Sequence, residues 1–414
     1  MFQPVRGTHD LYGEECQKHL AIIETMRKIA HLYGYQEIIT PVFEFSGVFH
    51  RLGETSDVVS KETYTFKDRG GDELTLRPEC TAPVVRAAIS NGLAQQLPLK
   101  FFYAGPMFRY DRPQKGRFRQ FDQAGVELCG VSEPQGDVEV IALAAHIMDV
   151  SGLSDRVTLE MNTLGDAESR YAYRDALVTY FSRYASSLSK ESLERLEKNP
   201  LRILDSKDAR EQEMIDEAPV LTDFLSDSSK NHFDKVLEGL NILEIPYQIN
   251  RKLVRGLDYY CHTAFEFIST ELGAQGAVLA GGRYDGLFKV MGGPDVPGVG
   301  WAAGVQRLML LSDPPLARQK VVAFAPMGEK AEQCALSLSQ DLRKQGVAVD
   351  LGFSGNISKR LKRAHKIGAQ WAVIVGDDEL REGNALVRDL TSGEQTKVPF
   401  PHLVPYLSSK KVES

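Results

Sequence analysis

Two long strand-like segments, separated by a short and strongly basic turn, constrain the fold of this chain more than any other feature. Residues 101–110 and 118–130 are rich in aromatic and branched side chains, which favour β-strands. The segment between them contains Pro113 and Gly116, two residues typical of turns. The sequence therefore predicts a long β-hairpin with a basic tip.

The tip of this hairpin carries an excess of positive charge, although the chain as a whole is acidic. Residues 109–119 contain five cations and one acid, whereas the 414-residue chain has a net charge of −7. The cations are Arg109, Arg112, Lys115, Arg117 and Arg119. On charge alone, a solvated surface loop and an anion site are about equally good interpretations. Arginine binds phosphate and carboxylate groups through two parallel hydrogen bonds, which would suit an anionic ligand.

The alternation of side chains in the second strand favours a binding site. With a period of two, Gln123 and Glu127 lie on one face of the strand. The small apolar residues Ala124, Val126 and Leu128 lie on the other face. A polar face in a glycine-containing strand is more typical of a pocket floor than of a core, so we expect the hairpin to border a pocket.

Two further segments have both a structural and a functional interpretation. Residues 76–83 (LRPECTAP) could be a helix start with Thr81 as its cap and Glu79 beside the helix dipole. Alternatively, Glu79 holds an ammonium group; by itself, the structural interpretation is the better one. Residues 253–260 (LVRGLDYY) could form a turn. Charged groups in a β-like segment are costly unless they are paired or bind a ligand, which slightly favours a function there.

The segment 273–304 is rich in glycine, which lets the backbone approach a ligand closely. Its ten glycines match neither the dinucleotide-binding motif nor the P-loop, so both of those nucleotide-binding classes are excluded. Arg307 follows at the start of an apolar helix. Because a cation at a helix N-terminus opposes the helix dipole, we expect Arg307 to have an anionic partner.

The N-terminal segment predicts a helix followed by a strand. Apolar residues recur at helical spacing over residues 11–33, where Asp10 can cap the helix and Gly34 can end it. Residues 36–45 are β-rich but contain Pro41. Because proline cannot donate to a ladder, this strand should lie at a sheet edge, a bulge or a subunit boundary.

The chain divides near residues 313–315 (DPP), which are typical of a linker. We predict a first domain over residues 1–320, with a helical insertion at about 166–245, and a second domain over 321–414. The second domain alternates strands and helices, which predicts a small α/β fold with a mostly parallel core. Its helix at 357–367 contains six basic residues, which indicate either a solvated face or contact with a nucleic-acid backbone.

Several classes of protein are excluded by composition. Five scattered cysteines without a C-x-x-C pair argue against a disulfide framework or a zinc ribbon, and they fit a reducing compartment. No apolar run reaches the roughly 18–20 residues that span a bilayer, and the N-terminus has no signal-peptide pattern. We therefore expect a cytoplasmic protein that does not contact a membrane.

Taken in chain order, these segments resemble the motifs of histidyl-tRNA synthetases, a family of class II aminoacyl-tRNA synthetases. The segments are residues 76–87 (the Arg-Pro-Glu-x-Thr segment), 101–130 (motif 2), 253–260 and 281–287 (the two histidine-specific signatures), and 298–311 (motif 3). Pro41 matches the proline of motif 1. The resemblance extends from about residue 3 to about residue 400, so it covers nearly the whole chain.

The resemblance implies an α+β catalytic domain built on an antiparallel class II sheet with flanking helices and a helical insertion. It also implies a C-terminal α/β anticodon-binding domain and a homodimer built around motif 1. The implied reaction joins histidine and ATP into histidyl-adenylate and pyrophosphate, and then transfers histidine to the 3′ end of tRNA(His). Mg²⁺ would bridge the phosphates of ATP, and no residue is assigned to a metal.

Roles of individual residues follow from the same resemblance, by motif position. The histidine-binding set comprises Glu79, Thr81 and Gln123 at the α-amino end, Glu127 and Tyr260 at the imidazole with Tyr259 beside them, and Arg109 and Arg255. The ATP-binding set comprises Arg109 at the α-phosphate and Arg117 and Arg307 at the distal phosphates. Arg255 would lie between the histidine carboxylate and the α-phosphate, so Arg255 and Arg109 are the expected catalytic residues.

Two positions depart from the family pattern. Cys80 stands where the bacterial family usually has glycine, and Gln306 stands where motif 3 usually has glutamate. The cysteine could tighten its turn. The glutamine removes an acid beside an ATP-binding arginine, which could weaken the positioning of phosphate or metal.

The main rival interpretation is the histidine-binding regulatory subunit of ATP phosphoribosyltransferase, a synthetase paralogue that charges no tRNA. That paralogue lacks the anticodon-binding domain. The presence of residues 321–414 and the complete set of arginines argue against it. A simple nucleic-acid-binding module is a weaker rival, because it would not need the polar pocket around Glu79, Gln123 and Glu127.

Overall fold

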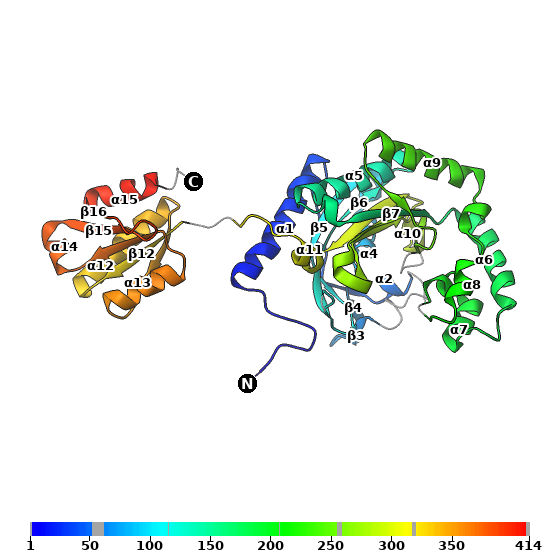
Figure 1. The fold of residues 1–414 in the computed structure, drawn as a ribbon, viewed down its shortest axis with the longest axis horizontal. Coiled ribbons are helices and arrows are strands. Elements are labelled where there is room, and N and C mark those ends of the chain that lie inside the picture. The colour runs from blue at the N-terminus through cyan, green and yellow to red at the C-terminus, as the bar shows by residue number, and fades with distance from the viewer. Residues whose placement is uncertain are drawn as a thin grey trace. The chain divides into compact units, whose positions relative to one another are not determined.

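The computed structural model describes residues 2–51, 62–114, 116–206, 208–254, 259–316 and 320–410. The chain forms two compact units, Met1–Leu316 and Ala317–Ser414, each with its own sheet and apolar core (Figure 1). Among the described residues, no helix combines the length and the apolar character that crossing a membrane requires.

A large eight-stranded sheet forms the centre of the first unit, with the order β1-β5-β6-β11-β10-β9-β7-β8. The strands are β1 Gln36–Glu37, β5 Leu99–Phe108, β6 Gln120–Cys129, β7 Thr158–Thr163, β8 Gln248–Ile249, β9 Cys261–Ile268, β10 Ala277–Arg283 and β11 Gly298–Gly304. The pairs at the two edges are parallel, and the five pairs between them are antiparallel. The predicted hairpin is confirmed, because β5 and β6 pair from Leu99 opposite Cys129 to Phe108 opposite Gln120.

Helices cover this sheet with their apolar faces. The helices of this main part of the first unit are α1 Gly13–Leu32, α2 Gly47–His50, α4 Thr81–Ser90, α5 Pro134–Val150, α9 Asp227–Ile242, α10 Leu287–Val290 and α11 Val305–Leu311, with the short turns η1 Leu93–Gln95, η2 Ser154–Arg156 and η5 Thr270–Gln275. In α5, the buried side chains Val140, Ala144, Ile147 and Met148 recur at helical spacing and pack in the main core. The same core contains Trp301 of β11, whose indole N–H donates to the carbonyl of Val140 at 2.9 Å.

Two expectations for the N-terminal segment are wrong in detail. Helix α1 begins at Gly13 rather than directly after Asp10, and its N-cap residue Tyr12 makes no side-chain cap hydrogen bond. The strand expected over residues 36–45 is split into β1 in the large sheet and β2 Phe43–Phe45 in a second sheet. The break contains Pro41, which has no backbone N–H to continue a ladder.

The second sheet of this unit is small and antiparallel. Its strand order is β2-β4-β3, with β3 at Tyr64–Lys67 and β4 at Glu73–Leu76. The hydroxyl of Thr75 in β4 lies 2.8 Å from that of Thr65 in β3 and 2.8 Å from that of Ser46, which directly follows β2. These two hydrogen bonds connect the three strands. This sheet leads directly into α4 and so positions the segment that begins at Arg77.

Residues between β7 and β8 form a helical region with a core of its own. Its elements are α6 Ala167–Ser182, α7 Lys190–Lys198, η3 Pro200–Asp205, α8 Gln212–Asp216 and η4 Leu221–Phe224, followed by α9. Tyr173, Leu177, Phe181 and Ile215 are among the side chains of a separate apolar cluster here. A separate core means that this region can hold its shape without contributing to the main sheet.

The second unit is a three-layer α/β structure. Its strands are β12 Val321–Pro326, β13 Ala348–Leu351, β14 Trp371–Val375, β15 Asn384–Asp389 and β16 Gln395–Pro399, in the order β13-β12-β14-β15-β16. Its helices are α12 Glu329–Lys344, α13 Ile357–Lys366, α14 Asp377–Glu382 and α15 Phe400–Ser409. Strands β13, β12 and β14 pair in parallel, whereas the β14–β15 and β15–β16 pairs are antiparallel. The parallel core is therefore smaller than the alternation of strands and helices suggests.

A fully buried ion pair joins the large sheet to α5. Arg283, the last residue of β10, donates from Nε to both carboxylate oxygens of Asp137, at 3.1 and 3.2 Å. The ring nitrogen Nε2 of His232 lies 3.3 Å from the same carboxylate. Burial alone would raise the pKa of Asp137, but His232 and Arg283 outweigh it and lower the pKa to about 2.

We predict that Asp137→Ala destabilises the first unit by about 3–5 kcal/mol, because Arg283 is left buried without its partner. Urea unfolding would be followed by the fluorescence of Trp301, in a Trp371→Phe background that removes the other tryptophan. The double variant Asp137→Ala/Arg283→Met should regain part of the loss. A double variant that is as unstable as the sum of the two single variants would show that an unpaired charge is not the cause.

The same pair predicts an acid dependence with a defined sign. Because the pKa of Asp137 in the folded protein lies below its ordinary value of 3.8, its contribution to stability is present above that value and is lost as the pH falls toward about 2. The Asp137→Ala variant should lack this part of the acid transition.

Candidate active site

A cavity of about 400 Å³ opens on the large sheet, beside the loop of the β5–β6 hairpin. Strands β6, β9, β10 and β11 contribute to its walls, and the start of α11 closes one end. Eight of the ten residues assigned from the sequence line it: Glu79, Thr81, Arg109, Arg117, Gln123, Tyr259, Tyr260 and Arg307. Of the other two, Glu127 is fully buried beside this lining, and Arg255 lies outside the described residues.

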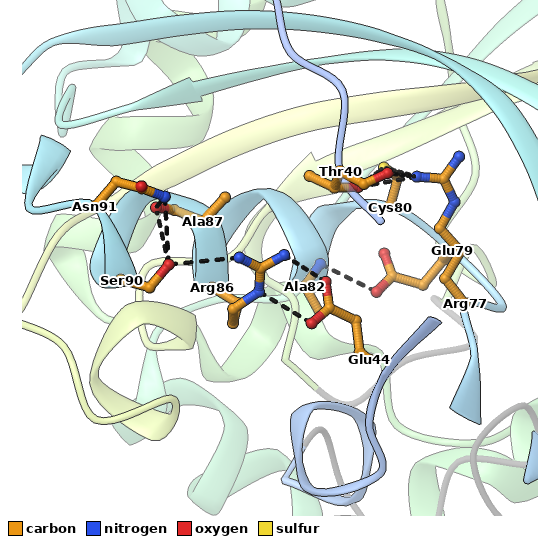
Figure 2. Close-up of polar contacts among 10 residues, drawn as sticks. All are labelled: Thr40, Glu44, Arg77, Glu79, Cys80, Ala82, Arg86, Ala87, Ser90 and Asn91. Carbon is orange, nitrogen blue, oxygen red and sulfur yellow. Dashed lines mark hydrogen bonds and ion pairs between the residues drawn. The ribbon is translucent and has the colours of Figure 1, made fainter. Parts of the chain in front are cut away.

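Glu79 caps a helix and also lines the cavity. One carboxylate oxygen accepts the backbone N–H of Thr81 at 2.7 Å. The other accepts that of Ala82 at 3.0 Å (Figure 2). Glu79 rather than Thr81 therefore caps α4. The same side chain lines the cavity while it is almost completely buried. Burial raises the pKa of Glu79, although the two backbone N–H groups oppose the shift. A cationic group in the cavity would stabilise the charged carboxylate.

The turn that presents Glu79 is held by Arg77. Its guanidinium donates to the carbonyls of Thr40 and Pro106, both at 2.9 Å, and to the Thr40 hydroxyl at 2.9 Å. Cys80 lies beside this network, with its sulfur 3.5 Å from the Thr40 hydroxyl (Figure 2). Burial raises the pKa of the Cys80 thiol to about 12. The residue that departs from the family pattern is therefore an uncharged packing group and not a nucleophile.

Glu127 is the most deeply buried acid of the site. Its carboxylate accepts hydrogen bonds from the hydroxyl of Thr81 at 2.6 Å and from the hydroxyl of Tyr284. Burial raises the pKa of Glu127 to about 8, although both hydroxyls oppose the shift. The backbone of Gly300 runs so close that a Cβ there would lie 1.9 Å from a carboxylate oxygen. The absence of a side chain at Gly300 therefore leaves the space that the Glu127 carboxylate occupies.

Tyr284 is the residue that the sequence analysis missed. It lies in the GGRYDGL segment, directly after Arg283, and its ring makes an edge contact with Tyr259 at 5.9 Å. A Cβ on Gly298 would lie 2.2 Å from this ring, so a second glycine makes room for it. The signature segment contained the signal, but only the fold shows that the hydroxyl reaches Glu127.

Gln123 lines the cavity and carries a buried acceptor. It precedes Glu127 by four residues on the same face of β6, as the period of two predicts, while Ala124, Val126 and Leu128 pack in the main core. Its side-chain oxygen is buried and has no hydrogen-bond partner within the described parts of the chain. A buried acceptor without a partner is costly, so a ligand that donates a hydrogen bond would be favoured there.

Three arginines converge at the other end of the cavity. Arg109 donates to the carbonyl of Pro78 at 2.9 Å and lies over the ring of Phe121. Arg307 donates to the carbonyls of Ala277 at 2.7 Å and Gly116 at 3.3 Å. Arg117 is paired with Asp111 and lies 3.7 Å from Glu62.

The charges of these arginines disfavour one another. Burial lowers the pKa of Arg307, and the charges of Arg109 and Arg117 lower it further. Burial likewise lowers the pKa of Arg109. An anion between the three guanidinium groups would relieve both effects, as expected of a phosphate site.

Gln306, the other departure from the family pattern, binds the protein rather than the cavity contents. Its amide donates to the carboxylate of Asp122 at 3.0 Å and accepts the backbone N–H of Asp122 at 2.9 Å. Both functional groups of the amide are satisfied by one neighbour. The glutamine therefore joins α11 to β6, a contact that a glutamate could not make in full because it has no donor.

Comparison with known proteins supports the family expected from the sequence and the observed fold. A family described as "Histidyl-tRNA synthetase" matches residues 7–308, and one described as "Anticodon binding domain" matches residues 321–410. The histidine–tRNA ligase of Rhodospirillum rubrum is 55% identical over 408 residues, which are 98% of each chain. That of Thermosynechococcus vestitus is 49% identical over 97% of this chain and 95% of its own.

Solved structures show the same similarity. The apo histidyl-tRNA synthetase of S. aureus superposes with a TM-score of 0.84 at 34% identity, over 99% of this chain and 100% of that chain. A Bacillus halodurans protein described as an ATP phosphoribosyltransferase regulatory subunit/histidyl-tRNA synthetase superposes with a TM-score of 0.67 at 22% identity, over 91% of this chain and 98% of its own. At that identity the second likeness concerns the fold alone. On its sequence and its structure, the chain belongs to the histidyl-tRNA synthetase family.

Proposed function

We propose that this chain activates histidine with ATP and transfers it to tRNA(His). The observation that carries the proposal is that one cavity is lined both by an acidic, hydroxyl-rich group of side chains around Glu79 and Thr81 and by three neighbouring arginines. Histidine would bind at the first group and the phosphates of ATP at the second. The direct test is pyrophosphate exchange into ATP that requires histidine, followed by charging of a tRNA(His) transcript; exchange without histidine dependence would refute the proposal.

At the histidine end, each polar group has a chemical match. The ammonium group would bind the carboxylate of Glu79 and the unpaired oxygen of Gln123, with the hydroxyl of Thr81 beside them. The imidazole would be read by Glu127 and Tyr260, with Tyr259 next to them. Readout by buried polar groups rejects ligands that cannot pair with them, which can supply a discrimination of about 10⁴–10⁵ without a separate editing site.

At the phosphate end, Arg109 would hold the α-phosphate, and Arg117 and Arg307 the distal phosphates. Adenylation brings together the histidine carboxylate and the α-phosphate, which are both anions. Positive groups that are already in place stabilise the added charge on the α-phosphate as the carboxylate attacks. Arg255 would lie between the two reacting groups, an assignment that rests on its place in the LVRGLDYY signature because Arg255 lies outside the described residues.

Mg²⁺ would enter with ATP. Magnesium keeps several waters and takes few protein carboxylates when phosphates are available. Glu266 lies in the cavity lining, and its negative charge raises the pKa of Arg307. Glu266 is therefore a carboxylate that could help to hold the ion beside the phosphates. When bound, the ion would neutralise phosphate charge.

The second unit supports the synthetase over the regulatory paralogue. That paralogue would have no use for an anticodon-binding domain, whereas residues 321–410 match one. We accordingly assign residues 1–320 as the catalytic domain, with the insertion at about 166–245, and residues 321–414 as the tRNA-binding domain. The cytoplasm, where ATP and tRNA are present, is the proposed location.

We further propose a homodimer formed around the small β2-β4-β3 sheet. Phe43, Phe45 and Phe66 of this sheet are exposed, as are Ile39 and Val42 beside Pro41. Large exposed apolar patches on a globular protein mark contacts with a partner. The patch coincides with the proline that matches motif 1, which favours a second copy of the chain as that partner.

Glu127→Gln provides a test of the histidine end. Because the pKa of Glu127 is about 8, we expect the KM for histidine in the wild type to rise as the pH passes through about 8, where Glu127 and the imidazole can no longer share a proton. The glutamine does not titrate, so the variant should lack this rise and lose about 10- to 100-fold in kcat/KM, from the loss of a charge-assisted hydrogen bond. Glu139→Gln is the control variant, because the Glu139 carboxylate pairs with Lys100 and does not line the cavity. An unchanged pH profile in the Glu127 variant would remove Glu127 from the imidazole site.

Arg255→Lys tests the assignment of the reacting groups. Lysine keeps the charge but loses the planar fork, so adenylation should slow by roughly 10²–10³ while the KM values change far less. Transfer from preformed adenylate to tRNA should be less affected, and single-turnover kinetics of the two steps would separate them. Equal losses in both steps would make Arg255 a general binding residue.

Phe45→Glu tests the dimer. The side chain is 63% exposed in the isolated chain, so a charge there should not disturb the fold but should oppose burial in an interface. Sedimentation should give twice the mass of 46.0 kDa for the wild type and a single copy for the variant. Leu336→Glu, at an exposed position of α12, is the matched control. A monomeric wild type at micromolar concentration would contradict the proposal.

A further inference from the structure

An exposed aromatic ring stands at one edge of the second unit. Phe353 lies in the turn between β13 and α13 and is 80% exposed. Exposure of a phenylalanine ring to water is unfavourable, so burial of the ring against a partner would gain free energy. The residues that follow it, from Ser354 to Lys359, are exposed as well.

Hydrogen bonds on both sides of Phe353 hold the turn that carries it. Arg360 is almost fully buried and donates to the carbonyl of Gly355 at 2.9 Å and to the carboxylate of Glu332 at 3.0 Å. The backbone N–H of Gly352 donates to the carbonyl of Phe324 at 3.0 Å. Anchors on both sides of the ring mean that its exposure is built into the fold and does not result from a loose loop.

The basic residues of α13 divide into two groups. Arg360 is buried in the anchor, and Arg363 forms two hydrogen bonds with the carboxylate of Asp350, at 2.8 and 3.0 Å. Lys359, Lys362 and Lys366 are exposed, and their ammonium groups have no hydrogen-bond or ion-pair partner within the described part of the unit. The lysines are therefore available to an external anion, and the two arginines of the helix are not.

The position of Phe353 in the sheet is one at which ligands bind in α/β folds. Helices α12 and α13 leave the carboxyl ends of the parallel neighbours β12 and β13, and they pack in two separate apolar clusters of the unit. The turn with Phe353 follows the carboxyl end of β13, and ligands of α/β folds bind outside the carboxyl ends of the parallel strands.

We propose that Phe353 stacks with one unpaired base of tRNA, while Lys359 and Lys362 bind the phosphates next to that base. A single-stranded nucleotide offers a flat ring and negative charge, which are what an exposed aromatic ring and unpaired lysines recognise. The acids Glu329 and Asp377, at the starts of α12 and α14, keep the nucleic-acid backbone on the α13 side. The inference rests on the proposed function, because it takes tRNA as the partner.

Phe353→Ala is the decisive variant, measured with the full-length protein and a tRNA(His) transcript. We expect the KM for tRNA to rise by about 5- to 100-fold, the range associated with the loss of one stacked base. Histidine-dependent pyrophosphate exchange should be unchanged, since it involves no RNA. Phe353→Tyr should stay within about 2-fold of the wild type, and Phe353→Leu should fail as the alanine variant does, because leucine is apolar but has no π-face.

Leu336→Ala, which truncates an exposed apolar side chain of α12, is the control and should charge tRNA normally. Normal charging by Phe353→Ala or by Phe353→Leu would overturn stacking. Loss of self-association in Phe353→Ala would show instead that the ring contacts a second copy, and it would also overturn the proposal. A wild-type protein that charges no tRNA(His) would refute the proposed function itself.

The lysines have a separate readout. Each contact with a single-stranded phosphate contributes about 0.7 to the slope of log binding constant against log salt concentration. Lys359→Ala/Lys362→Ala should therefore reduce the magnitude of that slope by about 1.4. The control Lys330→Ala/Lys344→Ala removes the same charge from α12 and should leave the slope within about 0.3 of the wild type. Equal slopes for the two double variants would remove the lysines from the RNA contact.

Discussion

Much of the site depends on the buried ion pair between Arg283 and Asp137. Such pairs contribute little net free energy, because the desolvation of two charges offsets their attraction. The effect of this pair is positional: it fixes the end of β10 against α5, and the next residue, Tyr284, then reaches Glu127. The hydrogen bond between Tyr284 and Glu127 therefore depends on a charge pair that does not line the cavity.

Local periodicity made the hairpin and its polar face predictable. The period of two in β6 separates Gln123 from Ala124 whatever the rest of the chain does, because the pleat of the strand imposes it. The excess of arginine in the turn indicated an anion for a similar reason, since charge is a property of composition. Motif resemblance then assigned roles, and the fold brings eight of these ten residues to one cavity.

Features set by long-range contacts were less accessible from sequence. Glu79 appeared to be either a helix cap or a ligand group, and only the geometry shows that one carboxylate lies in position for both. Tyr284 escaped notice because nothing in its own segment shows that its hydroxyl meets a residue 157 positions away. The start of α1 was misplaced because Asp10 has suitable chemistry for a cap, although the chain turns into the helix only at Gly13.

The glycines that line Glu127 and Tyr284 also determine how this site can change over generations. A Cβ at Gly300 or Gly298 would overlap the carboxylate or the ring, at 1.9 and 2.2 Å, so every other amino acid at these two positions displaces one of these two side chains. The space around the carboxylate and the ring is therefore bounded there by backbone rather than by replaceable side chains. Substitutions that reshape this part of the site without moving Glu127 or Tyr284 would have to occur at other positions of its wall.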